Sequence, residues 1–317
     1  MIEIQEASLF MSTQDGGRLG YQRYGVPTSG PMDWFAHQSA NALVKNPTGC
    51  ACIELGMSSA SFRILVECMV AVTGTGYSLM LNDTAQAMWT VLCCQAGDEL
   101  KLLKHPGGNW AYLAVAGGFN LNEMLGSTST YAPAGLGSGL QVGDRLNLAR
   151  KVNPTHSLVG RYLPTEKQPK YGNEVEARAM TGLHSERFTA AGLHSFWNTP
   201  YTVTPRSDRM AYRLQGEVIT HNAGADIISQ GMALGAVQVP ADGQPIVMLA
   251  DHPTTGGYTQ VAMVSRADLP LVAQCEPGVG RVKFKQVSLE EAQQAYLEEA
   301  QKIESGINDD VEDWMLL

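Results

Sequence analysis

Apolar residues alternate with polar ones in several short stretches of the chain, and each stretch follows a glycine turn. Three segments share this pattern, at 94–102, 140–148 and, more loosely, 276–284. The alternation is typical of a half-buried antiparallel strand. Because one turn–strand unit recurs, we expect an all-β chain. Small antiparallel barrels are a natural arrangement, since a closed sheet has no exposed edge.

The 3.6-residue period of a helix occurs in only a few places. Asp33 is a candidate N-cap for a helix that reaches about Val44, and residues 186–197 form a second candidate. The third begins at a capping box made by Ser288 and Glu291 and can end at Gly306. The acidic tail after it is expected to fray.

A proline-containing stretch with little periodicity separates two β-rich regions. It holds Pro154, Pro164 and Pro169. We therefore predict an N-terminal β-rich domain over 1–155 and a linker over 156–172. A C-terminal β-barrel domain over 173–287 is then followed by a helix and acidic tail over 288–317.

Composition excludes several classes of protein. The 317 residues carry 22 Lys and Arg against 31 Asp and Glu, a net charge of −9, which argues against a nucleic-acid binder. No apolar stretch approaches the ~20 residues of a membrane span. Acids near the start of the chain are unlike a signal peptide, so we expect a cytoplasmic protein. The six cysteines include no C-x-x-C pair, and no metal site is expected.

Familiar catalytic signatures are missing from the sequence. It contains no G-x-x-x-x-G-K-[ST] phosphate loop, no G-x-S-x-G elbow and no H-E-x-x-H pair. His184 and His194 recur in two Gly-Leu-His-Ser tetrads with no acid or thiol around them. We interpret them as surface or capping residues.

Three loops are candidates for chemistry. The first, 13–33, is dense in glycine, which lets a backbone approach a ligand closely. It equally fits a long turn that ends in an N-cap aspartate. The second holds Arg206, Asp208 and Arg209. An arginine fork suits a carboxylate or phosphate, but Asp208 paired with either arginine would also explain the pattern.

The third loop follows a continuous apolar run that reads as a buried strand, 246–250. Asp251, His252, Thr254, Thr255 and the glycines 256–257 come directly after it. Hydroxyl and backbone N–H groups can hold an anion or amide, and the acid can act as a base or orient a partner. The alternative is a plain glycine hairpin capped by Asp251.

Taken together, these loops resemble the biotin-dependent carboxyltransferase-like, or allophanate hydrolase subunit 2, family. The resemblance covers roughly residues 8–287, and its motifs keep the family's order. The matching segments are 13–18 with 25–33, 112–118, 125–131, 206–210, and 235–245 running on through 254–258.

This resemblance implies a cyclophilin-like β-barrel fold, with two β-barrel-like parts and a few short helices. Stand-alone bacterial members include the C subunit of 5-oxoprolinase and the KipA proteins. They work beside a B subunit, together with an A subunit in the case of 5-oxoprolinase. Such a complex hydrolyses 5-oxoproline, a small amide, to L-glutamate with ATP. Related domains in urea carboxylase carry a carboxyl group from biotin to urea.

We therefore expect a subunit of an ATP-dependent 5-oxoprolinase complex, an amide (lactam) hydrolase, with B-subunit-like and A-subunit-like proteins as its partners. ATP would bind with the partner subunit. The alternatives are a carboxyltransferase that acts on urea or a related amide and needs biotin, or a KipA-like regulator of a B-subunit-like protein. The expected catalytic residues are Asp251, His252, Thr254 and Thr255. The expected substrate-binding residues are Arg206, Asp208, Arg209, Gly256, Gly257, Tyr258, Ser29 and Asp33.

The sequence departs from the family pattern in the third loop. His252 and Pro253 stand where Arg-Gln is expected, and Thr259 and Gln260 stand where Pro-Lys is expected after Tyr258. Two expected cations are thus replaced by an imidazole and a neutral amide. Such a change can alter the choice of substrate.

Overall fold

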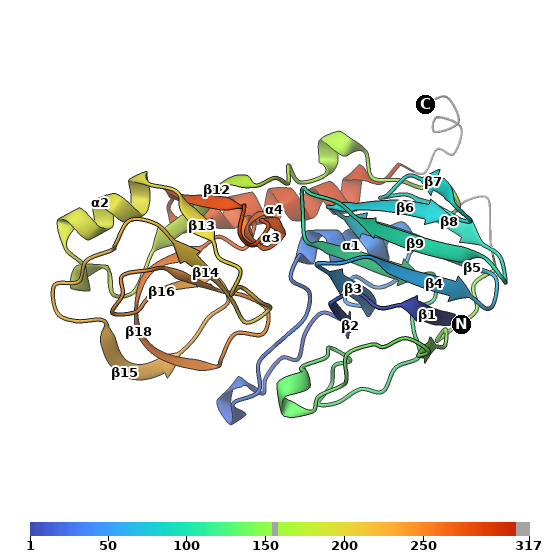
Figure 1. Ribbon diagram of the computed structural model, residues 1–317, viewed down its shortest axis with the longest axis horizontal. Helices are drawn as coiled ribbons and strands as arrows, with labels where there is room; N and C mark the ends of the chain where they lie inside the picture. The colour runs from blue at the N-terminus through green and yellow to red at the C-terminus, as the bar shows by residue number, and fades with distance from the viewer. Residues whose placement is uncertain (154–157, 309–317) are drawn as a thin grey trace. The chain divides into compact units, whose positions relative to one another are not determined.

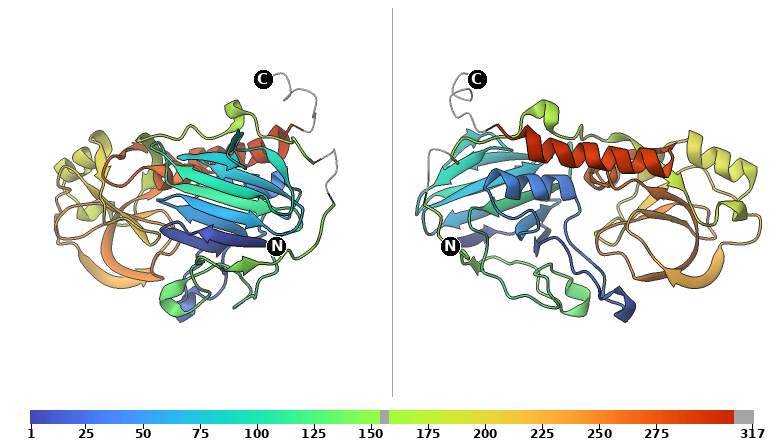
Figure 2. Two further views of the ribbon diagram at one scale, coloured as in Figure 1. Left: turned by 45° about the vertical axis from the view of Figure 1, so that its right-hand side comes forward. Right: turned by 180° about the vertical axis from the view of Figure 1, so that it is seen from behind.

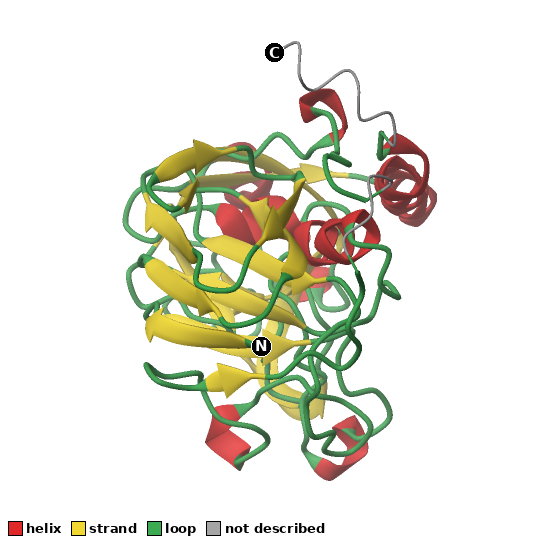
Figure 3. Ribbon diagram, turned by 90° about the vertical axis from the view of Figure 1, so that its right-hand side faces the viewer, coloured by secondary structure: helices red, strands yellow, loops and turns green. Residues whose placement is uncertain are grey.

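The chain folds mostly into β-strands that belong to two compact units. The computed structural model describes residues 1–153 and 158–308. The acidic tail from residue 309 onward lies outside the described residues. The N-terminal unit comprises Met1–Arg18, Ser29–Pro169 and Ala300–Leu317, and the C-terminal unit comprises Leu19–Thr28 and Lys170–Glu299. Strands dominate both units in Figures 1 and 3.

Two antiparallel sheets form the N-terminal unit. In the described residues the first sheet has the order β11 (Arg145–Leu146), β1 (Ile2–Glu6), β4 (Ala60–Ile64), β9 (Glu99–Lys104), β6 (Tyr77–Leu81) and β7 (Thr84–Gln86). The second has the order β2 (Phe10–Gln14), β3 (Cys52–Gly56), β10 (Trp110–Val115), β5 (Cys68–Gly74) and β8 (Val91–Cys94). One hydrophobic core draws on both sheets, for example Ile4 and Phe62 with Val70 and Leu113.

Helix α1 (Trp34–Leu43) packs on the second sheet of this unit (Figure 2). All residues of β5 and β10 are buried because the core covers one face and α1 contacts these two strands. The Thr73 hydroxyl on β5 donates to the carbonyl of Ala36 at 2.7 Å. The predicted helix after Asp33 is confirmed, and the Asp33 carboxylate accepts from the backbone N–H of Ala36.

A closed barrel forms the C-terminal unit. The described strands follow the order β12 (Glu174–Thr181), β19 (Arg281–Gln286), β13 (Tyr201–Val203), β14 (Ala211–Gln215), β17 (Ile246–Met248), β16 (Ala236–Val239) and β18 (Thr255–Val264). Pairing of β12 with β18 closes the ring. An additional strand, β15 (Asp226–Gly231), pairs with β18 alone. The prediction of an all-β, barrel-containing fold is confirmed.

Buried and exposed residues alternate along β14, so its side chains point in turn to the inner and the outer face of the barrel wall. Tyr212 and Leu214 are buried, whereas Arg213 and Gln215 are exposed. This is the period-two pattern of a strand with one face in the core. The side chains at 213 and 215 are therefore available to a site on the outer face of the barrel.

The remaining helices differ in how well the sequence predicts them. Helix α4 (Leu289–Gly306) begins with the predicted capping box, in which Ser288 and Glu291 exchange hydrogen bonds. The helix predicted over 186–197 is wrong in its bounds. It divides into η4 (Ser185–Arg187) and α2 (Ala190–Asn198), because the Thr189 hydroxyl caps α2 at the N–H of Gly192. Helix α3 (Leu269–Gln274) was not predicted.

The connecting segments contain three further 3-10 helices, η1 (Gln22–Tyr24), η2 (Ala132–Ala134) and η3 (Thr165–Lys167). The last of these falls inside the linker predicted over 156–172, and the two units meet along the chain at Pro169 and Lys170. Residues 19–28 belong to the C-terminal unit, although they lie between two segments of the N-terminal unit in the sequence. Neither unit is therefore one continuous stretch of chain. The four-part domain scheme itself stays a prediction.

Candidate functional site

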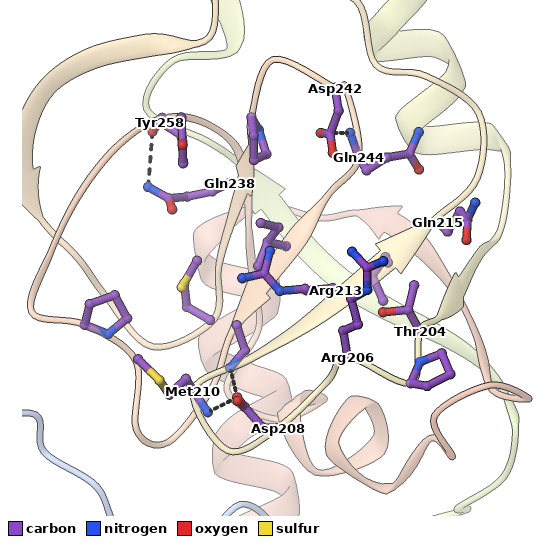
Figure 4. A pocket seen from close by; sticks show the side chains of 17 residues that line it. Thr204, Arg206, Asp208, Met210, Arg213, Gln215, Gln238, Asp242, Gln244 and Tyr258 are labelled. Atoms are coloured by element: carbon purple, nitrogen blue, oxygen red, sulfur yellow. Dashed lines mark hydrogen bonds between the residues drawn. The ribbon is translucent and has the colours of Figure 1, made fainter. Parts of the chain in front are cut away.

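A pocket of about 890 Å³ lies on the outer face of the C-terminal barrel (Figure 4). Its floor comes from β14, β16 and β17, and its walls come from two loops, 204–210 and 240–244. The lining includes Arg206, Asp208, Pro253 and Tyr258, so the pocket draws on both loops that the sequence singled out in this unit. The described residues that line it are Thr204, Pro205, Arg206, Asp208, Met210, Ala211, Arg213, Leu214, Gln215, Gln238, Pro240, Asp242, Gln244, Ile246, Met248, Pro253 and Tyr258.

Strand register arranges the floor in two rows. Arg213 is opposite Ile246, and Ile246 is opposite Gln238, so these three residues cross three adjacent strands. In the neighbouring row, Ala211 is opposite Met248. The second row belongs to a small apolar cluster, whose members are Met232, Ala236, Met248, Ala211, Ile246 and Met263. The floor therefore combines an apolar surface with a cation and a carboxamide.

The first wall loop is held by Asp208. Its Oδ1 accepts from the backbone N–H groups of Met210 at 2.8 Å and Ala211 at 3.2 Å. The ion pair considered between Asp208 and Arg206 or Arg209 is wrong, because this carboxylate is used to shape the turn. Arg206 is exposed on the pocket wall, and within the described residues its guanidinium makes no hydrogen bond or ion pair.

Arg209 points away from the pocket and pairs with Asp251. Its Nε donates to Oδ2 at 2.8 Å and its Nη2 donates to Oδ1 at 3.1 Å. Both side chains are 10% exposed. The backbone N–H of Asp251 also donates to the carbonyl of Arg209 at 2.9 Å. The pair therefore joins the two predicted loops outside the lining of this pocket. Catalysis by Asp251 and substrate binding by Arg209 stay predictions.

His252 is buried next to this pair, and its side chain forms a hydrogen bond within its own loop. Its Nδ1 donates to the carbonyl of Pro253 at 2.8 Å. Burial lowers the pKa of His252 below its ordinary value, so the ring is neutral at pH 7. Pro253 lines the pocket, whereas His252 does not. The two threonines stand at the start of β18, where the carbonyl of Thr254 accepts from Met232 and Thr255 pairs with Gly231.

A side chain at position 256 would be crowded by two neighbouring side chains. A Cβ there would lie 2.1 Å from Cε of Met232 and 2.6 Å from Nε2 of Gln238. At Gly257 the nearest atoms would be 3.4 Å away. The backbone carbonyl of Tyr258 accepts from Nε2 of Gln238 at 3.3 Å. Gly256 and Tyr258 thus fix the carboxamide of Gln238 at the edge of the pocket.

Two of the residues that depart from the family pattern are buried among neutral groups. Thr259 and Gln260 are 0% and 2% exposed, and Gln260 donates to Sδ of Met232 at 3.9 Å. Thr259 bonds to the carbonyl of Val239. A lysine at 260 would bury a cation among neutral groups in this chain, at a large cost in free energy. The neutral residues present here match their surroundings.

Ser29 and Asp33, the other two predicted substrate-binding residues, belong to the N-terminal unit. Ser29 is 8% exposed with a left-handed φ of 56°. Asp33 is fully buried as the α1 cap. The hydroxyl of Tyr112 accepts from the N–H of Asp33 at 2.8 Å and donates to Glu54 at 2.7 Å. These contacts hold the end of loop 13–33 in place.

Asp15 connects two of the segments on which the family resemblance rests. Its carboxylate accepts hydrogen bonds from the hydroxyls of Ser127, Thr128 and Ser129 and from the backbone N–H of Thr128. The buried guanidinium of Arg18 donates to the carbonyls of Met124 and Ser129. The segments 13–18 and 125–131 are therefore packed together within the N-terminal unit.

Most residues that line the pocket were not predicted as site residues, among them Arg213, Gln238 and Gln244. Arg213 and Gln238 sit in strands at alternate positions, which reads as an ordinary exposed face. Gln244 is engaged with the backbone of Gly216, both as acceptor at 2.8 Å and as donor at 3.3 Å. The alternation of apolar and polar residues in 211–215 could have predicted that the Arg213 side chain lies on the outer face of the barrel.

Other classes of site find no support in the part of the chain that the structure describes. There, no group of three or more His, Cys, Asp or Glu side chains could hold a metal ion. None of the described helices is long and apolar enough to cross a membrane. The six cysteines are free thiols.

Comparison with known proteins identifies the family. The chain is 35% identical to the C subunit of 5-oxoprolinase from Escherichia coli over 94% of this chain and 97% of that protein. It is 32% identical to the protein of the same name from Haemophilus influenzae, over 92% and 93%. The K. lactis urea amidolyase structure superimposes with a TM-score of 0.89 at 28% identity, over 95% of this chain and 20% of that one. Residues 24–286 match the family described as "Carboxyltransferase domain, subdomain A and B", and the chain belongs to this family.

Proposed function

We propose that the chain is a subunit of an ATP-dependent 5-oxoprolinase complex that cleaves 5-oxoproline to L-glutamate. The observation that carries the proposal is the extent of the match. Nearly the whole of two proteins named as the C subunit of 5-oxoprolinase aligns with nearly the whole of this chain. The urea amidolyase structure, by comparison, corresponds to this chain over only 20% of its length.

The chemistry of the pocket supports a small amide that carries a negative charge. Arg206 and Arg213 supply positive charge, and Gln238 supplies a carboxamide. Opening of 5-oxoproline breaks the lactam C–N bond. Water supplies the oxygen of the new carboxylate and a proton for the amine, while ATP is hydrolysed to ADP and phosphate. Cations in the pocket would bind the carboxylate of 5-oxoproline.

We propose that the partner subunits provide most contacts to ATP, and the N-termini of α1 and α4 support this. Helix N-termini attract phosphate through their free N–H groups and dipole. Here the N-terminus of α1 holds the Asp33 carboxylate, and that of α4 holds the Glu291 carboxylate. Acids at these positions repel phosphate. This arrangement supports the proposal that a B-subunit-like or A-subunit-like partner provides most contacts to ATP.

The test is glutamate release from 5-oxoproline and ATP. The chain would be co-expressed with its two candidate partners, and lysates with and without it compared. Glutamate that forms only when the chain is present is the expected result. A complex that assembles on a column yet releases no glutamate would overturn the proposal. A co-purifying partner with no turnover of any amide would instead favour a KipA-like regulator.

The similarity to urea amidolyase keeps a second function in view, a biotin-dependent carboxyltransferase that acts on urea or a related amide. This reaction needs a biotin carrier and a biotin carboxylase. Avidin separates the two functions, because it sequesters biotin. We expect glutamate release to be unchanged when avidin is added. Loss of activity with avidin would support the carboxyltransferase.

A further inference from the structure

We propose that Arg206 and Arg213 form a carboxylate subsite in the barrel pocket and that Gln238 selects the N–H group of a lactam ring. The inference rests on the proposed function and deepens it, because it names the residues that distinguish an anionic lactam from a neutral amide. It concerns Arg213, which lies outside the segments matched to the family, and Gln238, which lies in the matching segment 235–245 but was not predicted as a site residue.

The charge balance of the pocket is the first observation. In the described residues no carboxylate lies within 4.0 Å of either Arg206 or Arg213, whereas Arg209 pairs with Asp251. Two acids, Asp208 and Asp242, line the same pocket, so its formal charges balance, but each carboxylate is bonded to backbone N–H groups and not to an arginine. Asp208 accepts from the N–H groups of its own turn, and Asp242 accepts from the N–H of Gln244. Because neither guanidinium is bonded to a carboxylate, the N–H donors of both can bind a substrate carboxylate in a two-point contact.

The orientation of Gln238 is the second observation. This residue is 4% exposed, and its Nε2 donates to the carbonyl of Tyr258. The Oε1 atom therefore remains as the acceptor of this side chain toward the pocket (Figure 4). An acceptor fixed in this way recognises a donor such as the N–H group of an amide. It does not recognise a second acceptor.

The spacing of the two groups is the third observation. Arg213 and Gln238 flank Ile246 on neighbouring strands, so their backbones are roughly 9–10 Å apart. A five-membered lactam with a carboxylate beside its nitrogen, the substrate of the proposed function, is small enough to lie between these two strands. The partly buried Ile246 would contact the methylene groups of the ring. The substrate class is thus a small cyclic amide with an adjacent carboxylate.

The experiment compares 5-oxoproline with 2-pyrrolidinone, which has the same ring without the carboxylate. Steady-state assays of the complete complex would give the KM for 5-oxoproline and the inhibition by 2-pyrrolidinone. The variants are Arg206→Gln and Arg213→Gln. Arg281→Gln is the matched control, because Arg281 lies on β19 outside the pocket and its pair with Glu174 is exposed, at 3.7 Å.

We expect each pocket variant to raise the KM for 5-oxoproline by about tenfold or more, the effect of losing one charge-assisted hydrogen bond. The inhibition constant of 2-pyrrolidinone should change by less than about twofold, and the control should match the wild type. Variants that keep the wild-type KM, or that weaken both lactams equally, would overturn the inference while leaving the proposed function intact.

Direct binding separates failure of the subsite from failure of the proposed function. If the wild-type complex releases no glutamate, the proposed function fails. Calorimetric titration of the full chain with 5-oxoproline then tests the subsite alone. Binding that both arginine variants weaken by about tenfold supports the subsite. No binding by the wild type, or equal binding by all variants, overturns it.

Discussion

The guanidinium of Arg209 and the carboxylate of Asp251 face each other in a two-point contact, with N–O distances of 2.8 Å and 3.1 Å. The two residues are 42 positions apart in sequence. Each belongs to a segment that looks catalytic in the sequence, yet the pair is buried and faces away from the pocket. The contact fixes the loop of Arg206 relative to the loop of Pro253, and so sets the shape of the site.

Removal of one partner of this pair should destabilise the protein strongly. In Asp251→Ala the buried Arg209 cation loses the carboxylate with which it pairs, which costs about 3–5 kcal/mol. Urea unfolding, followed by tryptophan fluorescence, measures the free energy of unfolding. Glu174→Ala is the control, because its pair with Arg281 is exposed and should contribute no more than about 1 kcal/mol. Equal losses in the two variants would contradict a buried role for Asp251.

His37 should make stability depend on pH. Burial lowers the pKa of His37 from its ordinary value of 6.5 to about 4, despite the hydrogen bond between its Nε2 and the carbonyl of Gln14. Between these two values the unfolded chain binds a proton that the folded chain rejects. The contribution of His37 is therefore intact above pH 6.5 and is lost as pH falls toward 4, by about 1.4 kcal/mol per pH unit.

A His37→Gln variant tests this dependence, since glutamine keeps a donor for Gln14 and does not titrate. Unfolding free energies would be measured for both proteins from pH 7.5 to pH 4.5. The gap between the wild type and the variant should stay constant above pH 6.5. It should then change in favour of the variant as the solution becomes more acidic. Parallel curves over the whole range would show that His37 titrates in the same way in the folded and unfolded states.

Gly256→Ala should disturb Gln238. The new Cβ would lie 2.6 Å from its Nε2 and 2.1 Å from Cε of Met232, and both side chains are buried. We expect a loss of about 1–3 kcal/mol in stability and a higher KM for 5-oxoproline. At Gly257 a Cβ meets no atom closer than 3.4 Å, so Gly257→Ala should be the milder of the two in the unfolding assay. The reverse order would show that the packing around Gln238 is loose.

Asp33 should act through the cap of α1. Asparagine caps a helix about as well as aspartate does, whereas loss of the capping side chain costs about 1 kcal/mol. Asp33→Asn is thus expected to unfold near the wild-type urea concentration, and Asp33→Ala at a lower one. An Asp33→Asn complex that folds normally but has lost activity would assign the Asp33 charge to the substrate instead.

Capping residues and glycine turns predicted the starts of helices and strands that depend on neighbouring residues in the sequence. The Asp33 cap and the Ser288–Glu291 capping box each satisfy backbone N–H groups within one turn, and both helices begin where these signals place them. The recurrent glycine turns precede β9, β11 and β19. The helix predicted from 186 failed because Thr189 offers a second cap inside the segment, which restarts the helix three residues later.

The site was harder to predict because it depends on contacts between distant segments. Arg206, Asp208 and Tyr258 do line one pocket. Arg209, Asp251 and His252 are buried and do not line this pocket, so their predicted roles stay predictions. Arg213 and Gln238 enter the pocket through the register of β14, β17 and β16, and register is set by the closed barrel.

The most direct test is whether the purified complex forms its two products in equal amounts. Glutamate and inorganic phosphate would be measured together from 5-oxoproline and ATP, with the chain present, absent, or replaced by an Arg206→Gln and Arg213→Gln double variant. We expect equal amounts of the two products with the wild-type chain and no glutamate without it. With the double variant, glutamate release should be strongly reduced at low concentrations of 5-oxoproline. Full glutamate release in the absence of the chain would contradict the account.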